Sequence, residues 1–248
     1  MSFISLNFVV LFACTFILYH TLPSRFRKAT LLTASCLFIG FYHLTFLITA
    51  LILTLTTFYL GKWIGQTKRE SGMKGIYFSG VCFLVVSWLA FRYADRLTDC
   101  HILFPLGISF YTFQAISYLT EIYWQEEEPE KSLPDFMIYM LFFMKFLSGP
   151  IERAGDMLPQ LKSCKATDYA SMVYGMRLIV VGLIKKLILA DSIAPYIDGV
   201  FGSVYTASGV QLLMACLLYP IELYADFSGY TDIALGGARM LGFKLSPN

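Results

Sequence analysis

An uncharged apolar run over residues 29–61 sets the strongest limit on what this chain can fold into. It holds 33 residues without Asp, Glu, Lys or Arg. A helix needs about 20 apolar residues to cross a bilayer core, so the run is too long for one crossing. We therefore predict two membrane helices that turn near Phe41, Tyr42 and His43, where aromatic and polar side chains suit the interface.

The composition agrees with a membrane protein. Only 15% of the 248 residues are charged and 57% are hydrophobic, whereas soluble domains carry about 25% charged residues. One very apolar soluble core is disfavoured by the long uncharged runs. A net charge of +2 gives no argument for a nucleic-acid partner. The six cysteines are scattered, without a C-x-x-C pair or a histidine at ligand spacing, so no metal site is predicted.

The basic residues predict how the chain crosses the membrane. The first apolar segment, residues 3–22, precedes the cluster Arg25, Arg27 and Lys28, which is the reverse of a cleavable signal. By the positive-inside rule, the N-terminus is extracytoplasmic and the cluster cytoplasmic. Two crossings later, basic residues return in the segment 62–74, as the rule requires.

Further apolar segments complete an all-α polytopic fold. We predict spans at 76–91 and 102–124 separated from the run above by a turn at 65–75, and a short or re-entrant segment at 136–147 capped by Ser132. A helix over 169–190 begins at Asp168, and a last span begins near Ala207. The total is about eight membrane segments, short ones included. Without a repeat or a linker, residues 1–248 are interpreted as one domain.

The most informative polar stretch is PIELYADFSGYTDIALGGARMLGF, residues 220–243. Its acids, hydroxyls and glycines follow a membrane-length apolar run, so a protein-enclosed cavity suits them better than lipid. Glu222 and Asp226 lie one helical turn apart and could do acid–base work. The favoured alternative is structural, with Asp226 capping a helix broken at Gly229 and Asp232 pairing with Arg239.

Three other features carry polar groups into apolar surroundings. In GISFYTFQAISY, residues 107–118, Gln114 shares a helical face with Phe110 and Tyr118. We favour interhelical hydrogen bonding there over the lining of a substrate path. Lys185 and Lys186 lie on an otherwise apolar helix, where they could snorkel or occupy an internal polar seam.

A helix break is predicted at Gly149 and Pro150, in the sequence GPIER. It places Arg153 beside freed backbone N–H groups, which could hold an anion such as a phosphate or a thioester-bearing carrier. The alternative is a loop in which Arg153 pairs with Glu152 or Asp156, and the sequence does not decide between the two.

The motifs GISFYTFQAISY, GPIER followed by LPQL, and YADFSGYTDIALGGARMLGF occur in this order along the chain. Together they resemble the membrane-bound O-acyltransferase family, in its bacterial AlgI-like and DltB-like branch. The resemblance implies a ring of helices around a tunnel in the bacterial plasma membrane. An acyl thioester such as acetyl-CoA or an acyl carrier would serve as co-substrate, without a bound cofactor. The acyl group would pass to hydroxyls of an exported or cell-surface polysaccharide, directly or through an extracytoplasmic transfer partner.

The chain departs from the family pattern at its end. In this branch the signature histidine follows a P-x-N segment, and the sequence given stops at Asn248 within that pattern. His20, His43 and His101 do not match the family's histidine positions. We expect a partial domain over 1–248 that is inactive alone and is complemented by a C-terminal half, with no catalytic residue in this chain. The residues expected to shape the tunnel are Gln114, Gly149, Pro150, Arg153, Tyr224, Asp226, Ser228, Tyr230 and Asp232.

The alternative to an acyltransferase is a non-catalytic polytopic membrane protein, such as a relic, a scaffold subunit or a transporter-like half. Transporters often show inverted repeats, and the lack of a detectable repeat weighs against the last of these.

Overall fold

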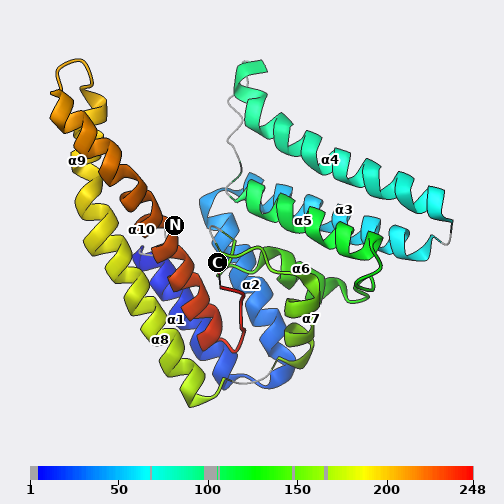
Figure 1. Cartoon of the computed structure of the whole chain (residues 1–248). Helices are drawn as coiled ribbons and strands as arrows, with labels where there is room; N and C mark the ends of the chain where they lie inside the picture. The colour runs from blue at the N-terminus through cyan, green and yellow to red at the C-terminus, as the bar shows by residue number, and fades with distance from the viewer. Residues whose placement is uncertain are drawn as a thin grey trace. The chain divides into compact units, whose positions relative to one another are not determined.

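The computed structural model describes residues 5–67, 69–97, 105, 107–146, 149–164 and 167–247, with side chains left out for 94–97. Within these ranges every regular element is helical, which confirms the predicted all-α fold (Figure 1). The elements are α1 (Leu6–Thr21), α2 (Ser24–Tyr42), α3 (Leu44–Gln66), α4 (Glu70–Leu97), α5 (Ile108–Tyr123), α6 (Leu133–Leu141), α7 (Ala154–Ser163), α8 (Tyr169–Leu183), the π-helical η1 (Ile184–Ala190), α9 (Asp191–Gly202) and α10 (Gly209–Met240).

Three of these helices, α3, α4 and α10, are long and apolar enough to cross a membrane, and α1 is a shorter apolar helix. The chain divides into two compact units. One comprises Met1–Leu147 and Ile151–Ala166, and the other comprises Ser148–Pro150 and Thr167–Asn248. The single domain expected over residues 1–248 stays a prediction.

In the first unit, the predicted turn in the run 29–61 is confirmed. His43 separates α2 from α3 with an extended backbone, φ −165° and ψ 137°. The turn expected over 65–75 is shorter than predicted, because α4 begins at Glu70. Lys74 pairs with Glu70 across one helical turn at 2.8 Å, and such i,i+4 pairs stabilise the start of a helix.

The short segment that follows Ser132 forms the core of this unit. Ser132 caps α6 by accepting a hydrogen bond from the backbone N of Asp135 at 3.4 Å, as predicted. The helix has 9 residues, or about 14 Å of rise, which is too short to cross a bilayer. Instead it contacts α2, α3 and α5, and the side chains of Phe136, Tyr139 and Phe143 are fully buried.

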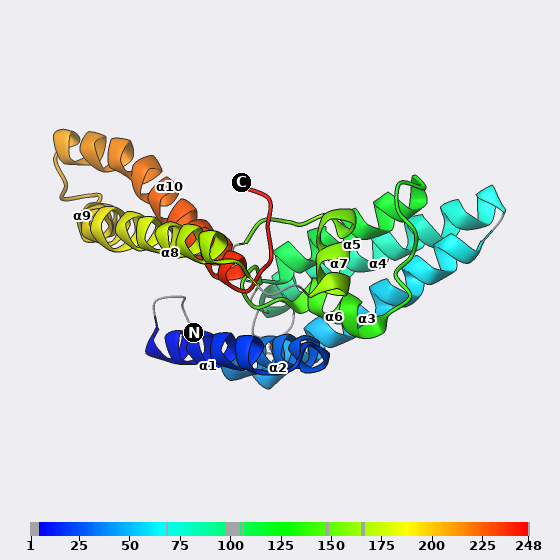
Figure 2. The same ribbon diagram turned by 90° about the horizontal axis from the view of Figure 1, so that it is seen from below.

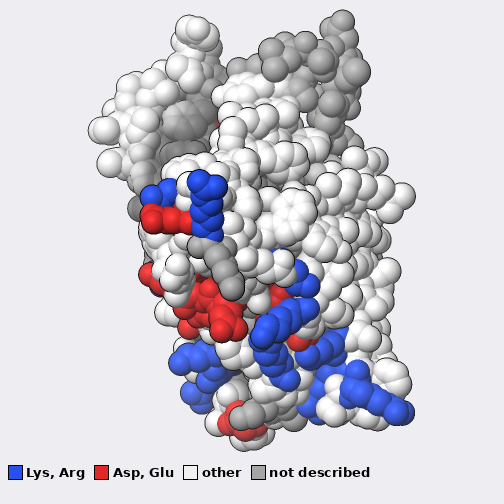
Figure 3. Space-filling model, turned by 90° about the vertical axis from the view of Figure 1, so that its right-hand side faces the viewer, with Lys and Arg blue, Asp and Glu red and all other residues white. Residues whose placement is uncertain are grey.

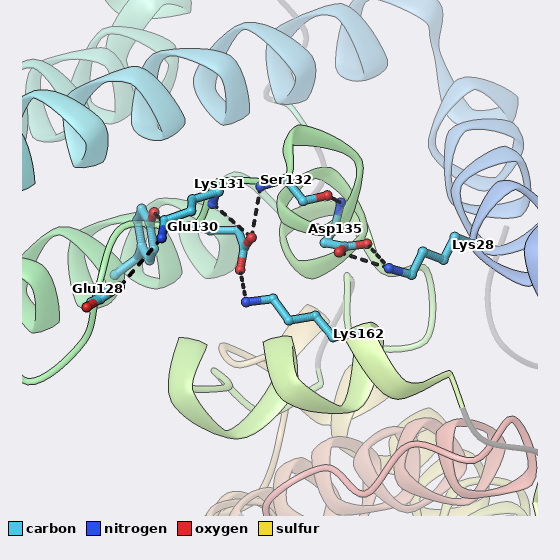
Figure 4. Close-up of polar contacts among 8 residues, drawn as sticks. Lys28, Glu128, Glu130, Lys131, Ser132, Asp135 and Lys162 are labelled. Carbon is cyan, nitrogen blue, oxygen red and sulfur yellow. Dashed lines mark hydrogen bonds and ion pairs between the residues drawn. The ribbon is translucent and has the colours of Figure 1, made fainter.

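Charged groups fasten α6 and the preceding loop to the surrounding helices (Figure 4). Lys28 of α2 binds the Asp135 carboxylate at 2.7 Å. Glu130 is buried, receives hydrogen bonds from the amides of Lys131 and Ser132, each at 2.8 Å, and pairs with Lys162 of α7 at 2.7 Å. Figure 3 shows charged side chains gathered on the lower part of one face, next to a broad uncharged surface.

In the second unit, α8 lies alongside α10 over most of its length (Figures 1 and 2). The helix predicted over 169–190 is present as α8 and η1, with Asp168 at the N-cap position. The predicted break at Gly229 is wrong, since α10 runs for 32 residues through both Pro220 and Gly229. Gly229 does not break α10, because it packs directly against Gly182 of α8.

Candidate functional site

Two pairs of glycines bring the backbones of α8 and α10 into direct contact. A Cβ atom added to Gly182 would lie 2.6 Å from the carbonyl oxygen of Gly229, and one added to Gly175 would lie 2.6 Å from that of Gly236. The two glycines of each helix are seven residues apart, so the contact recurs after two helical turns. Small residues of this kind let membrane helices approach closely.

This close approach places Lys185, in η1 just after α8, opposite two predicted site residues of α10. Its Nζ donates to Oδ2 of Asp232 at 2.6 Å and to the hydroxyl of Ser228 at 2.8 Å. Side-chain exposure is 28% for Lys185 and 16% for Asp232. The ammonium and the carboxylate therefore neutralise one another in a largely apolar helix pair.

Lys186 makes a second and separate set of contacts. It forms ion pairs with Asp226 of α10 and, at 2.8 Å, with Asp191 of α9. Its Nζ also lies 5.3 Å from the centroid of the Tyr230 ring, within cation–π range. The two lysines thus connect Asp226 and Asp232 of α10 to the opposite helix.

The lysines occupy the first turn of η1, the π-helical segment that follows α8. Single π-helical turns are frequent at functional sites. Here consecutive side chains reach carboxylates that are six residues apart on α10. Of the two interpretations of Lys185 and Lys186, the internal polar seam is confirmed.

Two structural predictions for the stretch are wrong. Asp232 pairs with Lys185 and not with Arg239, because two turns of helix separate Asp232 from Arg239 by about 10 Å along the axis. Arg239 lies instead beside the Tyr174 ring of α8, with Cζ 5.9 Å from the centroid. Asp226 is an interior residue of α10 and not a cap, and it pairs with Lys186.

The other predicted residues make none of the seam's hydrogen bonds or ion pairs. Tyr224 is on the same helix but 70% exposed. Gln114, in the first unit, is buried and donates from Nε2 to the carbonyl oxygen of Tyr139 at 2.9 Å, which is the interhelical hydrogen bond that was favoured. Arg153 is exposed at the N-cap position of α7, and Pro150 is buried. Gly149, next to Pro150, is buried as well.

A cavity of about 330 Å³ adjoins the Lys185–Asp232 pair in the second unit. Its wall includes the carboxylate residue Asp232 and two cationic residues, Arg239 and Lys244, together with Tyr174 and apolar side chains. The Nε atom of Arg239 is buried and makes no hydrogen bond within the described part of the chain.

The geometry suits binding and positioning better than proton transfer. Asp226 and Asp232 are each paired with a lysine ammonium group, so neither carboxylate is free to approach a substrate. The sequence singled out Asp226, Ser228, Tyr230 and Asp232 together, and the structure does bring them to one seam. It also adds Asp191 as a third carboxylate, which follows Lys186 by five residues at the junction of η1 and α9.

No family model matches the chain. Among curated proteins, it is 33% identical over 267 residues to the "Probable alginate O-acetylase AlgI" of Azotobacter vinelandii, covering 100% of this chain and 53% of the relative. The protein of the same name from Pseudomonas aeruginosa is 31% identical, with 100% and 51% covered. The "Peptidoglycan O-acetyltransferase" of Helicobacter pylori is 27% identical, with 90% and 50% covered. The chain thus spans about half the length of the curated relatives it matches.

Proposed function

The chain belongs to the membrane-bound O-acyltransferase family, and on this premise we propose that it forms part of an enzyme that O-acetylates an exported or cell-surface polysaccharide. The observation that carries the proposal is the similarity to alginate O-acetylases along the whole of this chain. Alginate is the first acceptor to test and peptidoglycan is the second, because the names of two relatives refer to these polymers.

The reaction transfers the acyl group of a thioester to a hydroxyl. It forms an ester bond and releases the thiol. We propose acetyl-CoA or an acetylated carrier as the donor, bound only as co-substrate. Attack of a hydroxyl on a thioester needs a base and a path that brings the two groups together. In this chain we assign the path, and not the base, to the seam of Asp226, Ser228, Tyr230 and Asp232.

The seam supports this assignment because its charges are already compensated. A wall of paired charges is polar enough for a thioester or a hydroxyl, yet it presents no unpaired charge to an apolar acyl group. The cavity of about 330 Å³ beside Asp232 supplies room next to that wall. The other residues expected to shape a tunnel, Gln114, Gly149, Pro150, Arg153 and Tyr224, stay a prediction from the resemblance.

The location and the partners follow from the same proposal. The enzyme would lie in the bacterial plasma membrane with its N-terminus outside, the remaining half of the family fold beside this chain, and an extracytoplasmic protein handing acetyl groups to the polymer. Arg25, Arg27 and Lys28 would then lie on the cytoplasmic side.

Complementation tests the function. The coding sequence that contains this chain, with whatever follows residue 248 in frame, is expressed in a Pseudomonas aeruginosa strain that lacks AlgI. Alkali-labile acetate is then measured on purified alginate and on peptidoglycan. We expect ester-linked acetate to return on alginate, and an Asp232→Asn variant to restore less of it. Acetate at the empty-vector level on both polymers, with the protein present in membranes and AlgI itself active, would refute the proposal.

A further inference from the structure

A long apolar groove runs along the α1–α2 hairpin of the first unit. Its wide part has a volume of about 1040 Å³ and extends from Leu6 of α1 to Phe41 of α2. A narrower part of about 300 Å³ continues it to Leu22 and Phe26, at the other end of the hairpin. The two parts are continuous, because Cys14 and Thr33 line both.

The sequence explains why the helices leave a hollow here. Small side chains occupy the facing positions Cys14, Thr33, Cys36 and Gly40, whereas larger apolar side chains form the rims. On these rims Leu6, Leu37 and Phe41 are 76%, 59% and 60% exposed. Exposed apolar surface of this extent marks an interaction site for an apolar partner.

The length of the groove fits a lipid chain. The 16 residues of α1 rise about 24 Å, whereas one leaflet contributes about 15 Å to a hydrocarbon core of about 30 Å. An acyl chain in an extended conformation can therefore lie along the groove without leaving it.

A cation stands at the narrow end. The basic cluster there contains Arg25, Arg27 and Lys28, and two of its members are engaged inside the unit. Arg27 donates to the carbonyl oxygen of Cys164 at 2.8 Å, and Lys28 pairs with Asp135 at 2.7 Å. Arg25 has no ion pair with any described residue, and its Cζ lies 4.8 Å from the centroid of the Phe26 ring that lines the groove.

We propose that this groove binds an anionic phospholipid, with one acyl chain between α1 and α2 and the phosphate at Arg25. The apolar hollow selects a lipid chain, and the free guanidinium at its end selects a phosphate with net negative charge over a zwitterionic headgroup. Guanidinium groups bind phosphate oxygens through paired donors. The groove shares no residue with the α8–α10 seam, and the proposal does not depend on acyl transfer.

Native mass spectrometry of the full chain in detergent tests the proposal. The probes are phosphatidylglycerol and phosphatidylethanolamine with identical acyl chains, added in equal amounts. We expect a one-lipid adduct that favours phosphatidylglycerol. Arg25→Gln is expected to reduce the ratio of the two adducts about fivefold. The matched control Arg69→Gln, at another exposed arginine, is expected to leave it unchanged.

Filling the groove tests the acyl-chain half of the site. Cys14→Phe and Thr33→Phe are expected to reduce both adducts at least fivefold, whereas Cys82→Phe, at an exposed cysteine of α4, is expected to reduce neither. Cys14 and Thr33 are exposed, and thermal unfolding confirms that each variant is folded. The proposal fails if Arg25→Gln leaves the ratio unchanged or if both groove variants keep their adducts.

A second arm identifies the occupant in native membranes. A photoreactive probe is attached to Cys14 in a variant that retains only this cysteine, and the crosslinked product is analysed. Transfer to phospholipid supports the proposal. Transfer to a polypeptide overturns it, because the groove would then hold a helix.

Discussion

The glycine contacts between α8 and α10 can be tested by adding one methyl group. In Gly182→Ala the new Cβ would lie 2.6 Å from the Gly229 carbonyl oxygen, and 2.9 Å and 3.0 Å from Cγ1 and N of Ile233. Ordinary contact begins near 3.4 Å, so the helices must separate by about 0.8 Å. Two of the three obstructing atoms belong to the backbone and cannot rotate away.

This separation has a calculable cost. Overpacking of a closely packed interface costs about 1–3 kcal/mol, which lowers the unfolding midpoint of a chain of this size by roughly 2–12 °C. The midpoint is measured by heating the purified chain in detergent and following the remaining monodisperse fraction by size exclusion. The control is Gly199→Ala in α9, where nothing lies within 4 Å of the added Cβ. Its midpoint is expected to stay or rise, since alanine favours helix. Equal midpoints for the two variants would refute the reasoning.

Three further changes probe the charged groups. Lys145 is buried, and its Nζ has no hydrogen-bond partner among the described residues. Burial lowers the pKa of Lys145 to about 7 despite the nearby Glu152 carboxylate. Lys145→Met should therefore raise the unfolding midpoint. That gain should be largest at and below pH 7 and should shrink as the pH rises toward 10.5, the ordinary pKa of lysine, because only the unfolded state still binds the proton in between. Burial alone would raise the pKa of Glu130, but hydrogen bonds from Lys162 and from the backbone amides outweigh it and lower this pKa below 4.5. Glu130→Gln should therefore cost about 1–3 kcal/mol at pH 7 and converge with the unchanged chain as the pH falls through that lowered pKa, whereas an equal midpoint at pH 7 would contradict this role. Asp232→Asn should lower the free energy of unfolding by about 1–3 kcal/mol, because it leaves Lys185 unpaired. Adding Lys185→Met to this variant should recover part of the loss. A double variant less stable than Asp232→Asn would argue against the pair.

The elements that local chemistry dictates were predictable from the sequence. The uncharged run 29–61 required two helices, and His43 separates them as expected. Ser132 predicted the start of α6, because a cap depends on residues within one turn. The start of α4 was placed too late, since glycines in the segment 65–75 suggested a turn where the Glu70–Lys74 pair stabilises a helix.

The residues of the site were predictable from the sequence, but the pairs that they form were not. Polar residues among apolar ones marked Asp226 and Asp232, and the same rule marked Lys185 and Lys186. Which ammonium meets which carboxylate depends on the antiparallel register of α8 and α10, and glycines of both helices set that register. Gly229 was misinterpreted as a break for the same reason, because its partner Gly182 is distant in sequence.

The lysine–carboxylate pairs also constrain how this part of the chain is made. During synthesis, α8 and η1 are complete before the acids of α10 have been joined to the chain. Until then Lys185 and Lys186 have no carboxylate of α10 to meet, and a lone ammonium at membrane depth is costly. We therefore expect α8 to wait at the insertion machinery or at the bilayer surface until α10 follows. The two helices would then enter lipid as one hairpin, with their glycine faces already in contact.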